Sequence, residues 1–242
     1  MERPISARPF DDESVKPSKD LAMKPSTLIV GGGRGIGGAL ARELGEAATI
    51  WTRSSGVDVA QREQVEPAFA ELVDLHGVPW GLVHTVGDFV ERPLLETSTE
   101  DFEALIASNL ASVFHVVQVV VPAMVNAGRG GRVVLFAAAG AGRPKGMRRA
   151  PLYFAIKAAV VQMARALASE VASSGVTVNC ISPGLIEHEH SHQESQRRMQ
   201  ARVPMGRLGS LKDVTALVRF LLSEESSYLT GEDLTVDGGL QL

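Results

Sequence analysis

Short apolar runs alternate with longer amphipathic stretches from residue 26 to residue 242. Strands are predicted at residues 27–30, 48–52, 81–85, 132–136, 176–181 and 234–236. Helices are predicted near 35–46, 61–76, 99–126, 152–174 and 211–223. Strands that alternate with helices favour a parallel sheet covered on both faces. We therefore predict one doubly wound α/β domain of the Rossmann type over residues 26–242.

Residues 1–25 do not share this pattern. They mix Pro, Ser, Lys and Asp without periodicity and contain no apolar segment typical of a signal peptide. We expect a flexible arm here and a cytoplasmic protein. The apolar run at 116–125 is interrupted by Gln118 and Pro122, so no membrane span is predicted.

Composition narrows the choice of partner and compartment. The net charge of −4 and the pI of about 5.9 give no reason to expect a nucleic-acid partner. Cys180 is the single cysteine, which excludes an internal disulfide and fits a reducing compartment. Because it stands in an apolar run, we interpret it as part of the core.

A glycine-rich turn directly follows the first predicted strand. In "LIVGGGRGIGGAL", Gly31, Gly35 and Gly37 lead into a predicted helix. Glycine tolerates positive φ, and its missing Cβ lets backbone N–H groups approach a pyrophosphate at the helix N-terminus. This context predicts a dinucleotide site.

The end of the second predicted strand indicates which dinucleotide binds. Arg53 and Ser54 follow "ATIWT", with no Asp or Glu beside them. An arginine suits a 2′-phosphate, whereas an acidic residue suits a free ribose hydroxyl. Arg34, inside the glycine turn, could stack on the adenine or add a second charge. NADP(H) is therefore favoured over NAD(H), although a solvated surface arginine is the alternative for Arg53.

With this turn, the pair Tyr153-x-x-x-Lys157 and the tail "YLTGEDLTVDGG" in order, the chain resembles the short-chain dehydrogenase/reductase family. The resemblance covers residues 26–242. It is most similar to the 3-oxoacyl-[acyl-carrier-protein] reductase branch in "VPMGRLGSLKDVTALVRFLLSEESSYLTGEDLTVDGG".

The resemblance implies a role for each matching residue. For the cofactor it implies Gly31, Gly35, Ile36 and Gly37 at the pyrophosphate, Asp58 and Val59 at the adenine, and Gly87, Pro183, Gly184 and Ile186 elsewhere along it. Tyr153 would be the general acid in reduction, Lys157 would bind the nicotinamide ribose, and Asn109 would hold a water of the proton relay. Positions i and i+4 share a helix face, so Tyr153 and Lys157 can address one ligand. A tyrosine with a pKa of about 10 needs help near pH 7, and a neighbouring ammonium would lower that pKa.

The chain departs from the family at the strand before Tyr153. Where the family has a serine that binds the substrate carbonyl, this sequence has Ala138, and no Ser or Thr occurs between Arg132 and Tyr153. Losing one such donor costs about 2.7–4 kcal/mol, or about 10²–10³ in rate. His188 or a backbone N–H near Gly140 are the alternative donors.

Other departures concern the turns around the cofactor. Val30 stands where the family has threonine, and the usual Asn-Asn-Ala-Gly turn is His84-Thr85-Val86-Gly87. Only four residues separate Arg53 from Asp58, too few for the family's helix and strand. We predict that this third βα unit is trimmed, leaving six strands, or seven if 57–59 form a stub.

Two polar segments could bind a metal or a substrate, and two apolar helices could bind further copies of the chain. His188, His190 and His192 alternate and could hold a metal, but a polar lid over the substrate is favoured and no metal is predicted. Cations at 143–149 could attract an anionic or carrier-linked substrate, or form a solvated loop. The helices at 109–126 and 152–174 are apolar on more than one face, and the resemblance implies a homo-oligomer, dimer or tetramer.

The leading hypothesis is an NADPH-dependent reductase of a ketone, which could be carrier- or CoA-linked. The alternative is a cofactor-binding protein with little or no turnover that acts as a sensor or assembly partner. Ala138 favours the alternative, whereas Asn109, Tyr153 and Lys157 favour the enzyme. The substrate and the physiological direction stay open.

Overall fold

A computed structural model describes residues 26–142, 149–187 and 198–242. The predicted arm at 1–25, three histidines of the predicted lid (His188, His190 and His192) and the cations at 143–148 lie outside the described residues.

The described residues form a six-stranded sheet in which every neighbouring pair is parallel. Its strands are β1 (Thr27–Val30), β2 (Ala48–Trp51), β3 (Gly81–His84), β4 (Gly131–Phe136), β5 (Val176–Pro183) and β6 (Asp233–Val236). The order is β2-β1-β3-β4-β5-β6, so the chain reverses direction across the sheet between β1 and β3. In open α/β sheets, ligands bind at the carboxyl ends of the strands beside such a switch point.

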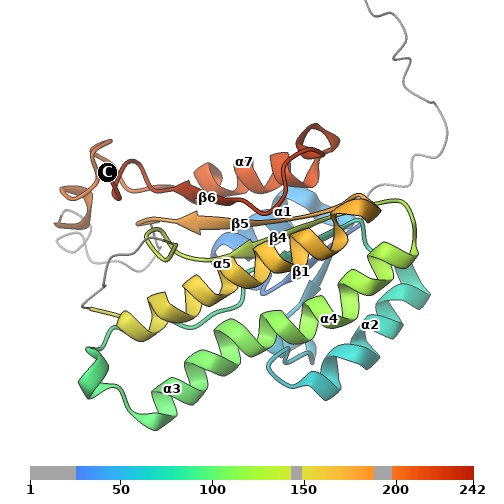
Figure 1. Cartoon of the computed structure of the whole chain (residues 1–242), viewed down its shortest axis with the longest axis horizontal. Coiled ribbons are helices and arrows are strands. Elements are labelled where there is room, and N and C mark those ends of the chain that lie inside the picture. The colour runs from blue at the N-terminus through green and yellow to red at the C-terminus, as the bar shows by residue number, and fades with distance from the viewer. Residues whose placement is uncertain (1–25, 143–148, 188–197) are drawn as a thin grey trace, which may run out of the picture.

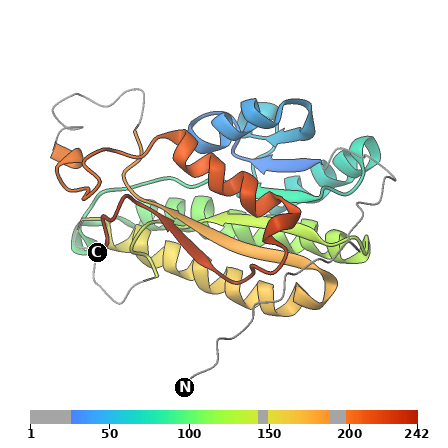
Figure 2. The ribbon, with the colours of Figure 1, turned by 90° about the horizontal axis from the view of Figure 1, so that it is seen from above.

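Helices cover both faces of the sheet (Figures 1 and 2). One face carries α1 (Gly35–Leu44) and α7 (Leu211–Leu222), and the other carries α2 (Arg62–His76), α4 (Ser112–Asn126) and α5 (Pro151–Val171). Helix α3 (Thr99–Ile106) continues into α4 through a π-helical turn, η4 (Ala107–Ala111). Short 3₁₀ turns are η1 (Gly45–Ala47), η2 (Arg53–Ser55), η3 (Leu94–Glu96), η5 (Ala172–Ser174) and η6 (Glu224–Ser226). The predicted doubly wound fold is confirmed.

Each strand supplies two cores because successive side chains point to opposite faces. Leu28 and Val30 of β1 join the core beneath α2, α4 and α5, whereas Ile29 joins the core beneath α1 and α7. Both faces are therefore apolar, which explains why the strands appear in the sequence as continuous apolar runs. Cys180 lies buried in the first core with a free thiol, as predicted.

Residues Thr99–Asn126 form one helical stretch, and Gln118 and Pro122 do not break it. By length and composition alone this stretch and Pro151–Ser174 could cross a membrane, contrary to the expectation that the interruptions exclude a membrane span. Core helices meet the same criterion, and each of these packs one face against the sheet.

The connection after β2 is short, as the spacing predicts. Residues between Trp51 and Arg62 contain the single turn η2 and no strand or further helix. The described sheet therefore has six strands, and the alternative of a seventh at 57–59 is wrong. Strand β2 is left at the edge of the sheet, with Ile50 partly exposed.

Candidate active site

A cleft of about 850 Å³ runs along the carboxyl ends of the strands, across the switch point between β1 and β3. The structure brings the predicted cofactor-binding residues together along it. Lining this cleft are Gly31, Arg34, Gly35, Ile36, Gly37, Arg53, Ser54, Asp58, Val59, Gly87, Tyr153, Lys157, Pro183, Gly184 and Ile186.

The glycine turn has a geometry that other residues could not adopt without strain. Gly31 and Gly35 have φ of +96° and +56°. A Cβ on Gly37 would lie 2.5 Å from the carbonyl oxygen of Gly31. Arg34, the N-cap of α1, makes no side-chain capping bond, so it leaves the first N–H groups of the helix to an anion. The turn therefore fits the pyrophosphate of a dinucleotide.

Thr85, which the sequence analysis noted only as a departure, holds this turn in place. Its hydroxyl lies 3.0 Å from the carbonyl oxygen of Val30 and 3.2 Å from that of Gly31, and donates to them. An added Cβ on Gly31 would approach the same hydroxyl to 2.6 Å. The hydroxyl that the family carries on the residue at Val30 is thus supplied here from the neighbouring strand end.

The end of the cleft where the sequence predicts the adenosine is formed by the short connection after β2. Thr52 caps the turn η2 by accepting from the N–H of Ser55, and its hydroxyl lies 2.9 Å from that of Ser54. Arg53 is exposed and lies 3.9 Å from the carboxylate of Asp88. A guanidinium beside the Ser54 hydroxyl is a suitable set of donors for a phosphate.

Tyr153 and Lys157 lie on one face of α5 at the opposite end of the cleft. Lys157 is 4% exposed, and its ammonium donates to the carbonyl oxygen of Phe136 at 2.9 Å and lies 5.8 Å from the centre of the Tyr153 ring. Burial lowers the pKa of Lys157 to about 8. Burial also raises the pKa of Tyr153 to about 12. The expected lowering of the tyrosine pKa by Lys157 is therefore not found, because desolvation of the buried phenol raises this pKa.

Asn109 lies behind Gly87 rather than in the cleft wall. The π-helical turn η4 points its amide inward, where Nδ2 donates to the carbonyl oxygens of Asp88 at 3.0 Å and Leu105 at 3.2 Å. Its Oδ1 is buried and has no hydrogen-bond partner among the described residues. A Cβ on Gly87 would lie 2.3 Å from this oxygen and 3.1 Å from the Lys157 ammonium nitrogen. Gly87 therefore keeps open the space between an unpaired acceptor and an ammonium.

His84, which stands at the start of the altered family turn, lies near Lys157, and the sequence pattern did not predict this proximity. It is fully buried at the end of β3, and burial together with the charge of Lys157 lowers its pKa to about 3. The ring is neutral at physiological pH, and its Nε2 has no hydrogen-bond partner in the described part of the chain. A polar group thus stands next to Lys157 without adding a competing charge.

The strand end at Ala138 carries only methyl groups. Ala137, Ala138 and Ala139 are all buried, and the N–H of Ala139 donates to the carbonyl oxygen of Pro183. Of the described residues that line this end of the cleft, Tyr153 and Lys157 alone have side-chain donors. His188, the alternative donor, lies outside the described residues.

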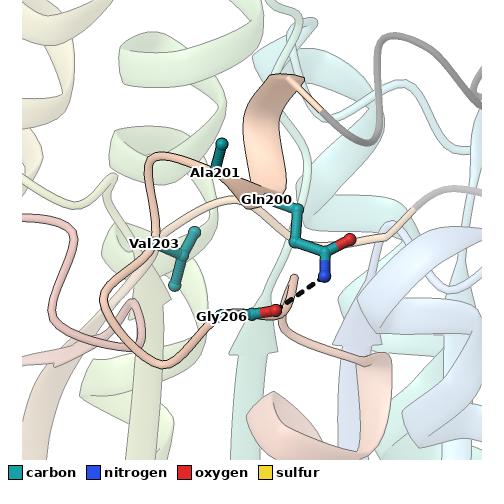
Figure 3. A pocket seen from close by; sticks show the side chains of 4 residues that line it. All are labelled: Gln200, Ala201, Val203 and Gly206. Atoms are coloured by element: carbon teal, nitrogen blue, oxygen red, sulfur yellow. Dashed lines mark hydrogen bonds between the residues drawn. The ribbon is translucent and has the colours of Figure 1, made fainter.

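A separate hollow of about 470 Å³ lies beside the segment that returns to the sheet before α7. It is lined by Gln200, Ala201, Val203 and Gly206, and the Gln200 amide donates to the carbonyl oxygen of Gly206 at 2.7 Å (Figure 3). None of the predicted cofactor-binding residues lines it, so we place the chemistry in the larger cleft.

Comparison with known proteins agrees with this geometry. Residues 34–241 match the family model described as enoyl-(acyl carrier protein) reductase. A 3-oxoacyl-[acyl-carrier-protein] reductase of Vibrio cholerae is 31% identical over 89% of this chain and 96% of its own. The chain belongs to the short-chain dehydrogenase/reductase family. The resemblance inferred from the glycine turn, the Tyr-Lys pair and the C-terminal tail is thereby confirmed.

Other members of the family differ in what they are named for. A tropinone reductase homologue of Arabidopsis thaliana is 31% identical over 88% of this chain and 89% of its own. The solved structure of ElxO with NADP bound has a TM-score of 0.82 and 26% identity, covering 90% of this chain and 99% of that one. These short-chain dehydrogenases/reductases share the fold of this chain, and the differences among their names leave its substrate open.

Proposed function

We propose that this protein is an NADPH-dependent oxidoreductase that reduces a ketone to an alcohol. The observation that carries the proposal is that Tyr153 and Lys157 line the same cleft as the glycine turn, with Asn109 directly behind Gly87. A carrier- or CoA-linked ketone, a cytoplasmic location and a homo-oligomeric state belong to the same proposal.

The described residues fit NADP(H) along the whole cleft. Gly31, Gly35, Ile36 and Gly37 would hold the pyrophosphate, and Asp58 and Val59 the adenine. Arg53 and Ser54, with Arg34, would hold the 2′-phosphate. Gly87, Pro183, Gly184 and Ile186 would enclose the nicotinamide end. The NADP bound in the similar ElxO structure supports this assignment.

When bound, NADPH supplies a hydride for the carbonyl carbon. Tyr153 keeps its proton well above pH 7, which suits a donor to the carbonyl oxygen. Lys157 would bind the ribose and stabilise the tyrosinate that remains after proton transfer. The unpaired Oδ1 of Asn109 would accept from a water that brings a proton back toward Lys157.

Ala138 favours a second candidate function. Without the serine hydroxyl, the substrate carbonyl would accept from Tyr153 alone among the described side chains of this wall, and turnover would fall by about 10²–10³. The same cleft could then serve a cofactor-binding protein that acts as a sensor or an assembly partner. The retained Asn109, Tyr153 and Lys157 make the enzyme the first choice.

The first test is a titration with NADPH and NADH, followed in the same sample by NADPH oxidation with an acetoacetyl thioester. We expect tighter binding of NADPH and slow oxidation that depends on the thioester. Ala138→Ser should raise the rate, by up to about 10². Ala141→Ser is the matched control, because both alanines are 8% exposed and only Ala138 lines the cleft.

The possible outcomes distinguish the two functions and can also exclude both. Turnover that Ala138→Ser increases and Ala141→Ser does not supports the reductase. NADPH binding without turnover over a broad panel of ketones, and without rescue by Ala138→Ser, supports the sensor or assembly partner. Absence of binding of either nucleotide would overturn both functions, because both depend on the glycine turn.

A further inference from the structure

Phe89 lies on the loop after β3, and its ring contacts the ring of Tyr153. The two rings meet edge to face, with centroids 5.0 Å apart and planes at 89°. The residue before it is held at both backbone groups. The N–H of Asp88 donates to the Ser108 hydroxyl at 3.3 Å, and its carbonyl oxygen accepts from Asn109 at 3.0 Å. Phe89 is therefore attached to the same framework that holds the Asn109 amide.

More than half of Phe89 stays exposed in spite of this contact. Its exposed fraction is 58%, whereas the Tyr153 ring beside it is partly buried and also contacts Phe154, with centroids 5.4 Å apart. A single exposed phenylalanine on a surface needs no explanation. This one differs because its ring contacts Tyr153, the proposed proton donor, which lines the cleft.

The walls at the reaction end of the cleft are apolar. They include Phe136, Ala137, Ala138 and Ile186, and Ala138 presents a methyl group where the family presents a hydroxyl. The charged residues lining the cleft, apart from Lys157, come from the glycine turn, from the connection after β2 and from Asp88, which faces Arg53. Beyond the carbonyl itself, the described part of this end offers little to a polar or charged substrate.

We propose that Phe89 is a specificity-determining residue, and that it packs against an apolar, preferably aromatic, group attached to the carbonyl carbon of the substrate. An aryl ketone would cover the exposed part of the Phe89 ring and rest against the Ala138 methyl. A small or carboxylate-bearing ketone would leave both surfaces in water. The inference rests on the proposed function, because it names the substrate class of the same site.

The experiment compares two ketones, acetophenone and acetoacetate, with NADPH as the reductant. The measured quantity is the ratio of kcat/KM for acetophenone to kcat/KM for acetoacetate. We expect Phe89→Ala to lower this ratio about tenfold and Phe89→Tyr to keep it, since ring contact and apolar burial are lost only with the first change. Phe102→Ala is the matched control, because Phe102 is an exposed phenylalanine of α3 and the ring contact with Tyr153 is made by Phe89 instead.

The ratio of the two kcat/KM values distinguishes a role of Phe89 in substrate specificity from a role in positioning Tyr153. If Phe89 only positions the tyrosine, Phe89→Ala would lower both rates equally and leave the ratio unchanged, which overturns the inference. A ratio that falls equally in Phe102→Ala overturns it as well.

A binding measurement keeps the inference testable if the wild type reduces neither ketone. Saturation-transfer NMR of acetophenone with the NADP⁺-loaded protein should then show contact that Phe89→Ala removes and Phe89→Tyr retains. In that case the proposed reduction has failed while the subsite stands. Absence of acetophenone contact in the wild type, with NADP⁺ bound, would overturn the subsite itself.

Discussion

Thr85, directly after β3, supplies the hydroxyl that Val30 lacks at the glycine turn. The family's threonine before the first glycine is Val30 here, yet a hydroxyl still reaches the carbonyl oxygens of Val30 and Gly31, because β1 and β3 are adjacent parallel strands. The glycine turn is thus pinned from the next strand. Only a view across the sheet reveals this substitution.

Replacing Thr85 should weaken cofactor binding through the turn. Thr85→Val keeps the volume but leaves the Gly31 carbonyl without this donor, which costs about 1 kcal/mol, or about fivefold in the Kd for NADP⁺. Thr85→Ser retains the hydroxyl and should restore most of the affinity. Fluorescence titration of both variants checks this. Equal Kd values for the wild type and Thr85→Val would show that the hydroxyl does not hold the turn in its binding conformation.

At the scale of elements, the loss of the third βα unit means that the predicted adenosine end of the cleft is formed by a single 3₁₀ turn, η2. In η2 the hydroxyls of Thr52, Ser54 and Ser55 form a closed network, and Arg53 stands outside it with an exposed side chain. These hydrogen bonds fix the turn, and the exposed Arg53 guanidinium lies near the carboxylate of Asp88. The connection therefore presents the Arg53 guanidinium and the Ser54 hydroxyl although it lacks the helix and strand that the family has at this place.

This element predicts the choice between the two cofactors. Arg53→Ala should raise the Kd for NADP⁺ about tenfold. This increase is at the lower end of what the loss of a charge-assisted hydrogen bond causes, because the Arg53 side chain is exposed to solvent. The Kd for NAD⁺, which has no 2′-phosphate, should change little. Isothermal titration with both nucleotides measures the difference, and Arg42→Ala, an exposed arginine of α1, serves as the control. A parallel loss for NADP⁺ and NAD⁺ would place Arg53 away from the 2′-phosphate.

At the scale of the whole molecule, α4 and α5 also carry some apolar side chains on their outer sides. Helix α4 buries Val113, Val116 and Val120 against the sheet, yet Phe114 on its outer side is 45% exposed. The outer face of α5 carries small residues such as Ala155 and Ala166. Such a face is suited to a second copy of the chain, in line with the predicted homo-oligomer.

We expect the wild type to sediment as a dimer or tetramer and Phe114→Glu to shift it toward the monomer, because a carboxylate would be buried unpaired in the contact. Sedimentation velocity measures both. Phe220→Glu provides the control, since Phe220 is similarly exposed on α7, on the opposite layer. A monomeric wild type, or an assembly that Phe114→Glu leaves intact, would contradict the predicted interface.

Much of the fold and of the cofactor cleft followed from the sequence alone. Strand and helix positions are local properties, since burial of a strand on both faces demands a continuous apolar run, and the run can be recognised without knowing its neighbours. The spacing between Arg53 and Asp58 excluded a full βα unit in the same way. Glycine turns and a Tyr-x-x-x-Lys pair are likewise short motifs whose geometry is set within a few residues.

Tertiary structure alone decided the relations between distant residues. Thr85 on the Gly31 carbonyl, Phe89 on the Tyr153 ring and the unpaired Asn109 oxygen facing Lys157 all join different elements. The pKa of Tyr153 also required the structure, because desolvation depends on everything packed around the phenol rather than on the one charged neighbour visible in the motif. Local patterns determine elements, whereas packing across the sheet determines which groups meet and how strongly water is excluded from them.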